Sequence, residues 1–249
     1  MMAARLTLAA LASAFAFAAT AAEPPPKGAA VPKGHYAPLD SLPDWGGVWI
    51  LKFGPPPAPP LARGVYAERY AAAKAAAAVN NGEFPRQFSY CTPPGISYQM
   101  GLAQYPIEFL FNPGRVTMLF EAWMQVRRVF TDGRPHPDDW EPTLYGHSTG
   151  HWEGDTLVID TVGIKPGALI TVGLGHSDKE RVSERLHLAA GDPDTLVDEM
   201  TVTDPEALQQ PWAVTFRYQR HRDWDELEFV CSENDRNPIG ADGKAEFKP

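Results

Sequence analysis

From residue 105 onward, apolar and polar residues alternate along most of the chain. Alternation with a period of two is typical of β-strands that bury one face. The longest such run covers residues 115–131, and its two faces differ in chemistry. One face is apolar, and the other carries Thr117, Glu121, Trp123, Gln125 and Arg127. The pattern therefore predicts one long strand with a polar face.

The same alternation predicts about nine strands, which are separated by turn residues such as Gly, Pro, Asn and Asp. We expect strands at residues 44–53, 106–112, 115–131, the two arms of 143–163, 180–189, 195–203, 213–221 and 227–231. Short connections between sequential antiparallel strands favour an up-and-down barrel or a sandwich. We predict a mainly β fold, an antiparallel up-and-down, lipocalin-like barrel of about 8–10 strands with one helix.

The predicted helix covers residues 61–79. Alanine, which has the highest helix propensity, makes up most of its second half, and Asn80, Asn81 and Gly82 follow as a stop signal. The next segment, 83–105, looks irregular. A connection of this length is often a lid or a binding loop, and the alternative is a plug at one end of the barrel.

Residues 143–163 form the centre of the predicted fold, because the pair Gly154-Asp155 between two β-prone runs is a strong hairpin signal. A two-residue loop would pair Glu153 with Thr156 and place alternate side chains on opposite faces. One face would carry His147, Thr149, His151, Val158, Asp160 and Val162, and the other Ser148, Gly150, Trp152, Leu157, Ile159 and Thr161. A three-residue loop would break this register, and the sequence leaves open which face points into the barrel.

Three of the seven histidines, His147, His151 and His176, lie close together in sequence. On the predicted hairpin face, Asp160 lies on the opposite strand, diagonally between His147 and His151. The three side chains suit acid–base catalysis, because histidine titrates near neutral pH. An alternative is a divalent metal bound by the three histidines. Four residues along a strand span about 13 Å, which is near the limit for two imidazoles on one zinc ion. In a third interpretation these side chains are structural. We predict no cofactor, with a divalent metal as the alternative.

Other residues would bind a substrate if their strand face looks into a cavity. Arg127 could hold a carboxylate or phenolate, and Glu121 could orient the substrate or act as a base. Trp123 and Tyr145 would suit an aromatic or sugar ligand, and His176 completes the predicted binding set. If the same face looks outward, it is an ordinary solvated surface.

The N-terminal residues indicate export. A basic start, an apolar run from Leu6 to Ala19 and small residues up to Ala22 predict a signal peptide over residues 1–22. We expect a flexible Pro-rich leader at 23–43, a single barrel domain at 44–235 and a polar tail at 236–249.

Export would make the protein periplasmic or secreted, with no membrane span. In such a compartment the two cysteines, Cys91 and Cys231, most simply form a disulfide, and two buried free thiols are the alternative.

Charge and motifs exclude several classes of function. The net charge of −9 argues against a nucleic-acid partner, because phosphate contacts need clustered Lys and Arg. No nucleophile elbow, P-loop or dinucleotide fingerprint occurs in the chain. The expected partner is a small-molecule ligand or substrate.

Two strings of residues resemble known families. The string 146–161, with the pattern G-H-S-x-G-H-W-E-G-D-T-L-V-x-D-T, resembles a functionally unassigned family of secreted bacterial proteins, and the strings 125–137, 204–208 and 228–231 extend the likeness. It implies secretion but no activity. Gly47-Val48-Trp49 resembles the G-x-W signature in the first strand of lipocalin-like barrels, which implies a small-molecule cavity.

The leading hypothesis is an extracytoplasmic enzyme that acts on a small aromatic or sugar-derived compound. His147, His151 and Asp160 would transfer protons. A lyase, isomerase or hydratase reaction fits best, because the chain shows no cofactor motif and no nucleophile motif. One alternative is a non-catalytic, lipocalin-like binding protein. Another is a metal-dependent hydrolase that uses His147, His151 and His176.

Overall fold

The computed structural model describes residues 36–85, 91–102 and 105–231, so the predicted signal peptide, most of the leader and the polar tail lie outside it. Nine of its strands belong to the barrel: β1 (Val48–Leu51), β2 (Ile107–Asn112), β3 (Arg115–Phe120), β4 (Gln125–Phe130), β5 (His147–Glu153), β6 (Thr156–Val162), β9 (Arg181–Ala189), β10 (Asp192–Thr203) and β11 (Trp212–His221). The remaining elements are helices α1 (Gly64–Val79) and α2 (Ile96–Gln99), 3-10 turns at Leu39–Ser41 and Ala122–Met124, and the small sheet of β7 (Leu169–Thr171) and β8 (Leu174–Gly175).

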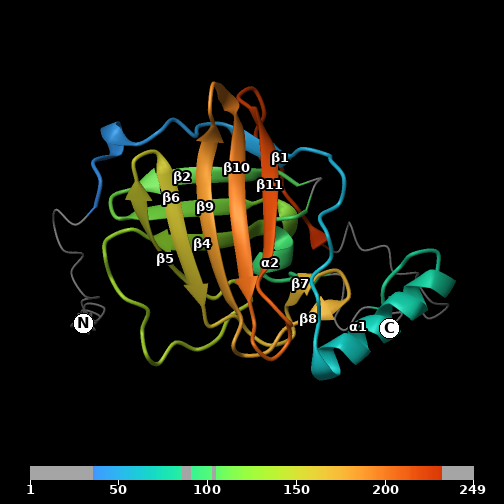
Figure 1. The fold of residues 1–249 in the computed structure, drawn as a ribbon. Coiled ribbons are helices and arrows are strands. Elements are labelled where there is room, and N and C mark those ends of the chain that lie inside the picture. The colour runs from blue at the N-terminus through green and yellow to red at the C-terminus, as the bar shows by residue number, and fades with distance from the viewer. Residues whose placement is uncertain (1–35, 86–90, 103–104, 232–249) are drawn as a thin grey trace, which may run out of the picture. The chain divides into compact units, whose positions relative to one another are not determined.

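The barrel is closed, in the order β1-β11-β10-β9-β6-β5-β4-β3-β2 (Figure 1). This confirms the predicted mainly β barrel. All neighbouring strands are antiparallel except β4 and β5, which run parallel and pair only at Val129–Ser148 and Phe130–Thr149. The opposite junction, between β1 and β2, also has two residue pairs, at Val48–Glu108 and Trp49–Ile107. Two narrow seams therefore join β2–β3–β4 to the other six strands.

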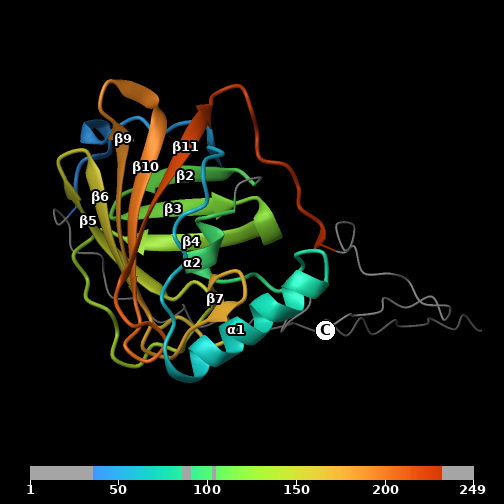
Figure 2. The same ribbon diagram turned by 45° about the vertical axis from the view of Figure 1, so that its right-hand side comes forward.

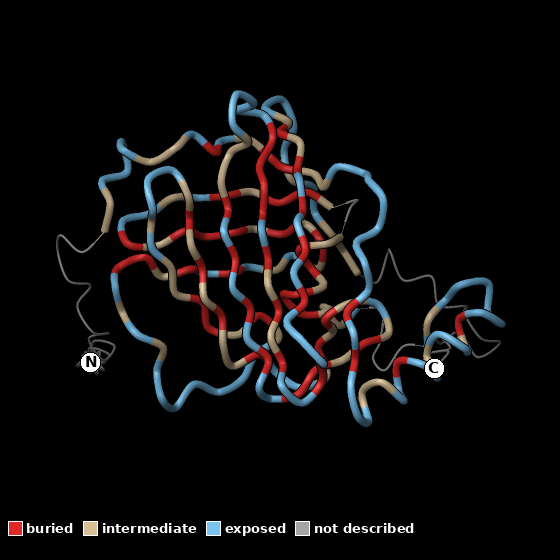
Figure 3. The backbone as a smooth tube through the Cα atoms, viewed as in Figure 1, coloured by how far each residue is buried: buried red, intermediate tan, exposed pale blue. Residues whose placement is uncertain are grey.

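Side chains alternate between the barrel interior and the outer surface, as a period of two requires. Buried and exposed residues alternate along β9 and β11 (Figure 3). The inward side chains form one hydrophobic cluster, which includes Trp49, Phe109, Met118, Leu157, Leu186 and Phe216. The interior is therefore largely a packed core.

Helix α2 packs against inward-facing side chains, which agrees with the plug interpretation of residues 83–105. The Tyr218 hydroxyl of β11 donates a hydrogen bond to the Met100 carbonyl at 2.7 Å. The Tyr145 hydroxyl donates to Gln99 Oε1 at 3.1 Å. Both Met100 and Gln99 are buried.

Helix α1 confirms the helix that the Ala-rich segment predicts, and it contacts β8 beside the barrel (Figure 2). Only Tyr70 and Ala77 of this helix are buried. Because alanine favours the helix without a large apolar face, most of α1 stays exposed. None of the described helices is long and apolar enough to cross a membrane.

The prediction of a single strand over residues 115–131 is wrong. A turn at Ala122–Met124 separates β3 from β4, with Trp123 and Met124 at φ of 57° and 49°. The turn shifts the alternation, so that Arg127 pairs with the inward-facing Met118. The apolar and polar faces of the predicted strand therefore do not continue through the turn.

The C-terminal part of the barrel domain also differs from the prediction, because residues 227–231 form no strand. Residues 222–231 instead run along the outside of the barrel, where the Leu227 N–H donates to Glu121 Oε2 at 2.9 Å. The segment ends at Cys231, which forms the predicted disulfide with Cys91. This bond ties residue 231 to the segment before α2.

Candidate functional site

The β5–β6 hairpin adopts the predicted register. Glu153 pairs with Thr156 across the two-residue loop, and His147 pairs with Val162 at the other end. Gly154 has a φ of 60°, a left-handed conformation that glycine adopts without strain. Leu157, Ile159 and Thr161 are buried in the barrel, so the face that carries the histidines points outward. The following residues lie on that outer face: His147, Thr149, His151, Val158, Asp160 and Val162.

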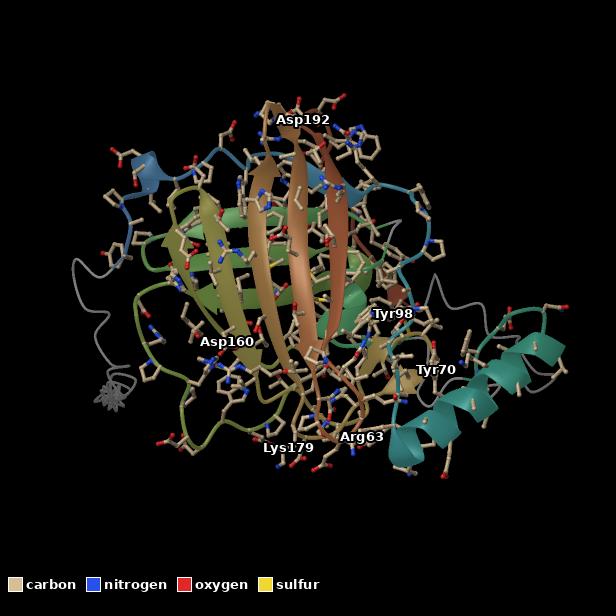
Figure 4. The ribbon with its side chains drawn as sticks, in the orientation of Figure 1. Arg63, Tyr70, Tyr98, Asp160, Lys179 and Asp192 are labelled. Atoms are coloured by element: carbon tan, nitrogen blue, oxygen red, sulfur yellow. A yellow bond between two sulfur atoms is a disulfide. The ribbon has the colours of Figure 1, made fainter. Side chains whose placement is uncertain are left out.

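His136, which is not one of the three predicted histidines, joins His147 to Asp160. It comes from the loop between β4 and β5, which folds over the outer face of the hairpin. His136 Nδ1 lies 2.8 Å from His147 Nδ1, and His136 Nε2 lies 2.9 Å from Asp160 Oδ2. Thr149 Oγ1 is 3.2 Å from the same Nε2. We call His147, His136 and Asp160 the histidine relay; Asp160 is labelled in Figure 4.

The hydrogen-bond partners of the relay favour one arrangement of its protons. Both oxygens of Asp160 accept hydrogen bonds from the guanidinium of Arg181, so the carboxylate acts only as an acceptor. His136 Nε2 must then carry a proton. In a neutral His136 the Nδ1 atom accepts, and His147 Nδ1 donates to it. In this tautomer His147 Nε2 is left unprotonated, and it makes no hydrogen bond within the described residues.

His147 lies among aromatic rings that remove it from water. Phe130 stacks on its imidazole with centroids 5.3 Å apart, and Trp140 meets it edge to face at 4.8 Å. Burial, together with the nearby His136 and Arg134, holds the pKa of His147 below its usual value. The imidazole is therefore neutral at pH 7. His147 has an exposed fraction of 5%. A neutral imidazole with a free Nε2 is a base.

A hollow of about 250 Å³ lies beside the relay on the outer face of β5 and β6. Its lining consists of Gly133, Arg134, Thr149, Gly150, His151, Val158, Ile159 and Asp160. Thr149 and Asp160 belong both to this lining and to the contacts of His136. We call this depression the outer hollow.

The structure does not bring all the predicted catalytic residues together. His147 and Asp160 meet only through His136, which the sequence patterns did not indicate. His151 points away from the relay, because its Nε2 atom lies 3.1 Å from Glu153 Oε1 on the exposed part of the hairpin. The one available signal for His136 is its place in the string 125–137, which belongs to the family resemblance.

His176 lies in a different, buried cluster. Its Nδ1 atom is 3.1 Å from Glu180 Oε2, and Ser97 donates to Glu180 Oε1 at 2.7 Å. The three histidines of the metal alternative therefore have separate surroundings. Within residues 36–85, 91–102 and 105–231, no group of three or more His, Cys, Asp or Glu side chains is arranged to hold a metal ion.

The predicted substrate-binding residues are also dispersed. Glu121 lies on the turn after β3, where it accepts the Leu227 N–H. The Trp123 ring lies 5.8 Å from that of Phe229. Tyr145 is buried against Gln99, and burial raises the pKa of its hydroxyl. None of these side chains lines the outer hollow.

Arg127 lies inside the barrel with an exposed fraction of 1%. It forms a two-pronged ion pair with Glu184, in which Nη1 lies 2.9 Å from Oε1. It also donates to Ser148 Oγ at 3.1 Å and to Thr161 Oγ1 at 2.8 Å. All of its nearest polar partners are side chains of the barrel, so in this structure Arg127 has a structural role.

A second carboxyl group, Asp198, faces the interior without a hydrogen-bond partner among the described residues. Burial is the main cause that raises the pKa of Asp198 well above its usual value, and the nearby Glu184 adds to the shift. The neighbouring Tyr218 hydroxyl also has a raised pKa, chiefly because of burial. The raised pKa favours the protonated form of the Asp198 carboxyl group.

Comparison of the sequence with family models and curated proteins does not help to assign a role to this site. No family model matches the chain, and no curated protein is significantly similar to it. The resemblance carried by residues 146–161 stays a prediction, and function has to be argued from the geometry.

Proposed function

We propose that this protein is an extracytoplasmic enzyme that catalyses proton transfer on a small aromatic or sugar-derived compound. The observation that carries the proposal is the histidine relay, in which an unprotonated imidazole nitrogen is coupled to a second histidine and a carboxylate. Lyase, isomerase and hydratase reactions need such a base and require neither a covalent nucleophile nor a redox cofactor.

In the proposed mechanism His147 Nε2 takes a proton from the substrate. The proton on His147 Nδ1 then moves to His136 Nδ1 across 2.8 Å, and the positive charge passes to His136. Asp160 stabilises that charge from the far side of the ring at 2.9 Å. The reverse movement returns a proton to the product. The charge thus develops next to a carboxylate and away from the aromatic surroundings of His147.

Two further observations support this assignment. Trp140 is 39% exposed beside His147 and offers a ring against which an aromatic or sugar substrate can pack. The disulfide between Cys91 and Cys231 suits an oxidising compartment, in line with the export expected from residues 1–22.

The first test is turnover by the purified chain on a panel of phenolic compounds, sugars and sugar acids, followed by NMR. On any substrate found, His147→Gln and His136→Gln should each lower kcat by about 10²–10⁴-fold, the usual contribution of general acid–base catalysis. His187→Gln is the matched control, because His187 lies on β9 outside the relay. His151→Gln should lower kcat far less than either relay variant, because His151 lines the outer hollow without touching the relay.

The pH profile of kcat/KM gives a second test. Because the pKa of His147 lies below its usual value, the base stays unprotonated at mildly acid pH. Activity should be retained as the pH falls through 6.5 and be lost only below it. Full activity in His147→Gln, or a larger loss in His151→Gln than in His136→Gln, would overturn the proposal. Ligand binding without turnover on any compound would favour the non-catalytic alternative.

A further inference from the structure

The size and position of the outer hollow limit what it can bind. Its volume of about 250 Å³ is below the range of roughly 300–1,000 Å³ that is usual for drug-sized ligands, so it suits a single ring. Its lining combines the apolar residues Gly150, Val158 and Ile159 with polar side chains. Among the described residues no Phe, Tyr or Trp side chain lines it, so hydrogen bonds rather than ring stacking would orient a ligand there.

Every ionic group around the hollow already has a partner of opposite charge. Arg134 forms a two-pronged ion pair with Asp132, with Nε 2.9 Å from Oδ1. Asp160 is held by Arg181 and His136. These pairs balance one another in formal charge. An anion would therefore meet Asp160, and a cation would meet Arg134, without a free counter-charge for either.

The lining nevertheless offers both donors and acceptors of hydrogen bonds. Among the described contacts, Arg134 uses Nε and Nη2 but not Nη1. Thr149 brings a hydroxyl group, and His151 uses only Nε2 and leaves Nδ1. Asp160 adds carboxylate oxygens, which accept more than one hydrogen bond each. Hydroxyl groups, which both donate and accept, match such a mixed set.

We infer that the outer hollow is a binding subsite for a neutral, polyhydroxylated ring, either a free monosaccharide or the terminal unit of a glycoside. The inference rests on the proposed function, because it takes the hollow as one part of the substrate site. His136 lies between the two parts: Thr149 and Asp160 touch it from the hollow, and His147 touches it from the other side. A substrate bound in the hollow therefore lies next to the relay.

The test uses the full chain labelled with ¹⁵N and amide spectra during titration. The probes are methyl glucoside, methyl galactoside, cellobiose, lactose, glucuronate, glucosamine and benzoate. We expect a neutral sugar to shift the amides of Gly133 and Gly150, with a dissociation constant of about 1 mM that is usual for so small a ligand. Glucuronate, glucosamine and benzoate should bind at least tenfold more weakly. Tighter binding of a disaccharide than of the methyl glycosides would identify the terminal unit of a glycoside.

A variant that fills the hollow provides the matched comparison. Val158→Phe places a ring in the hollow and should weaken sugar binding at least tenfold. Thr156→Phe introduces the same side chain on the same face of β6, outside the hollow, and should leave binding unchanged. His151→Ala removes one lining side chain without adding bulk and should weaken binding by a smaller factor.

The outcomes separate this inference from the proposed function. Preferred binding of benzoate or glucuronate, or equal binding by Val158→Phe and the parent protein, would overturn the inference. The relay would still stand if His136→Gln lowered turnover. Conversely, sugar binding in the hollow together with full turnover in His136→Gln and His147→Gln would keep the subsite and remove the relay.

Discussion

Among single residues, Asp198 ties the stability of the barrel to pH. Its carboxyl group is buried without a hydrogen-bond partner among the described residues, and its pKa is raised in the folded protein. An acid with a raised pKa binds its proton more tightly in the folded state than in the unfolded state. Its contribution to stability is therefore complete below about pH 4 and is lost as the pH rises toward the folded pKa.

Asp198→Asn should remove that dependence. The amide cannot ionise, so the variant should gain stability relative to the parent as the pH rises from about 4 to about 8, as measured by urea unfolding at several pH values. Glu199→Gln is the control, because Glu199 is the next residue on β10 and points outward. A constant stability difference between the Asp198→Asn variant and the parent across this range would contradict the assignment.

The sequence could predict some of the site residues and not others. His147 and Asp160 follow from the hairpin, because a two-residue loop fixes which side chains face each other. His136 lies in a loop without periodicity, and its contact with Asp160 depends on how that loop folds back. Asp198 did carry a signal, since it shares the alternation of the buried Leu196 and Met200 on β10.

Among the elements, the junction of β3 and β4 shows the limit of predicting strands from alternation. The apolar pattern continues from Val116 through Met124, so no local signal marks the turn. The turn forms with Trp123 in a left-handed conformation, which is unfavourable for a large side chain and has to be stabilised by tertiary contacts. The resulting shift moves Arg127 into the barrel, next to Glu184.

Two glycines in residues 143–163 allow the free-energy cost of backbone strain to be measured apart from the cost of crowding. Gly146 and Gly154 have nearly the same φ, 61° and 60°. A Cβ atom on Gly154 would meet no atom within 4 Å, whereas one on Gly146 would lie 2.5 Å from the Val162 carbonyl oxygen. Gly154→Ala should therefore cost only the conformational penalty of about 1–2 kcal/mol.

Gly146→Ala should cost about 1–3 kcal/mol more, because the backbone has to move as well. Urea unfolding of both variants measures the difference. Equal losses of stability would show that crowding at Gly146 is relieved without cost. The Gly146→Ala variant should also disturb the relay, since His147 is the next residue, and its imidazole signals would shift in NMR spectra.

For the whole molecule, the disulfide is a covalent cross-link between distant parts of the chain. It joins Cys91 to Cys231 over a sequence separation of 140 residues. A cross-link over so long a loop restricts the unfolded chain and contributes about 2–5 kcal/mol. The double variant Cys91→Ser, Cys231→Ser should lose stability by that amount and unfold at a lower temperature.

Reductant serves as the control for this prediction. It should lower the unfolding temperature of the parent toward that of the double variant and leave the variant itself unchanged. Equal stability of the parent and the double variant without reductant would show that the segment 222–231 is held by its other contacts, such as the hydrogen bond from Leu227 to Glu121.

The two narrow seams of the barrel affect how the protein avoids association with other copies of itself. A closed barrel has no edge strands, but here closure depends on two residue pairs at each seam. If a seam opened, β4 and β5, or β1 and β2, would present free N–H and C=O groups to other molecules. Such edges are templates for pairing between chains. The few hydrogen bonds at the seams therefore protect the protein against aggregation out of proportion to their number.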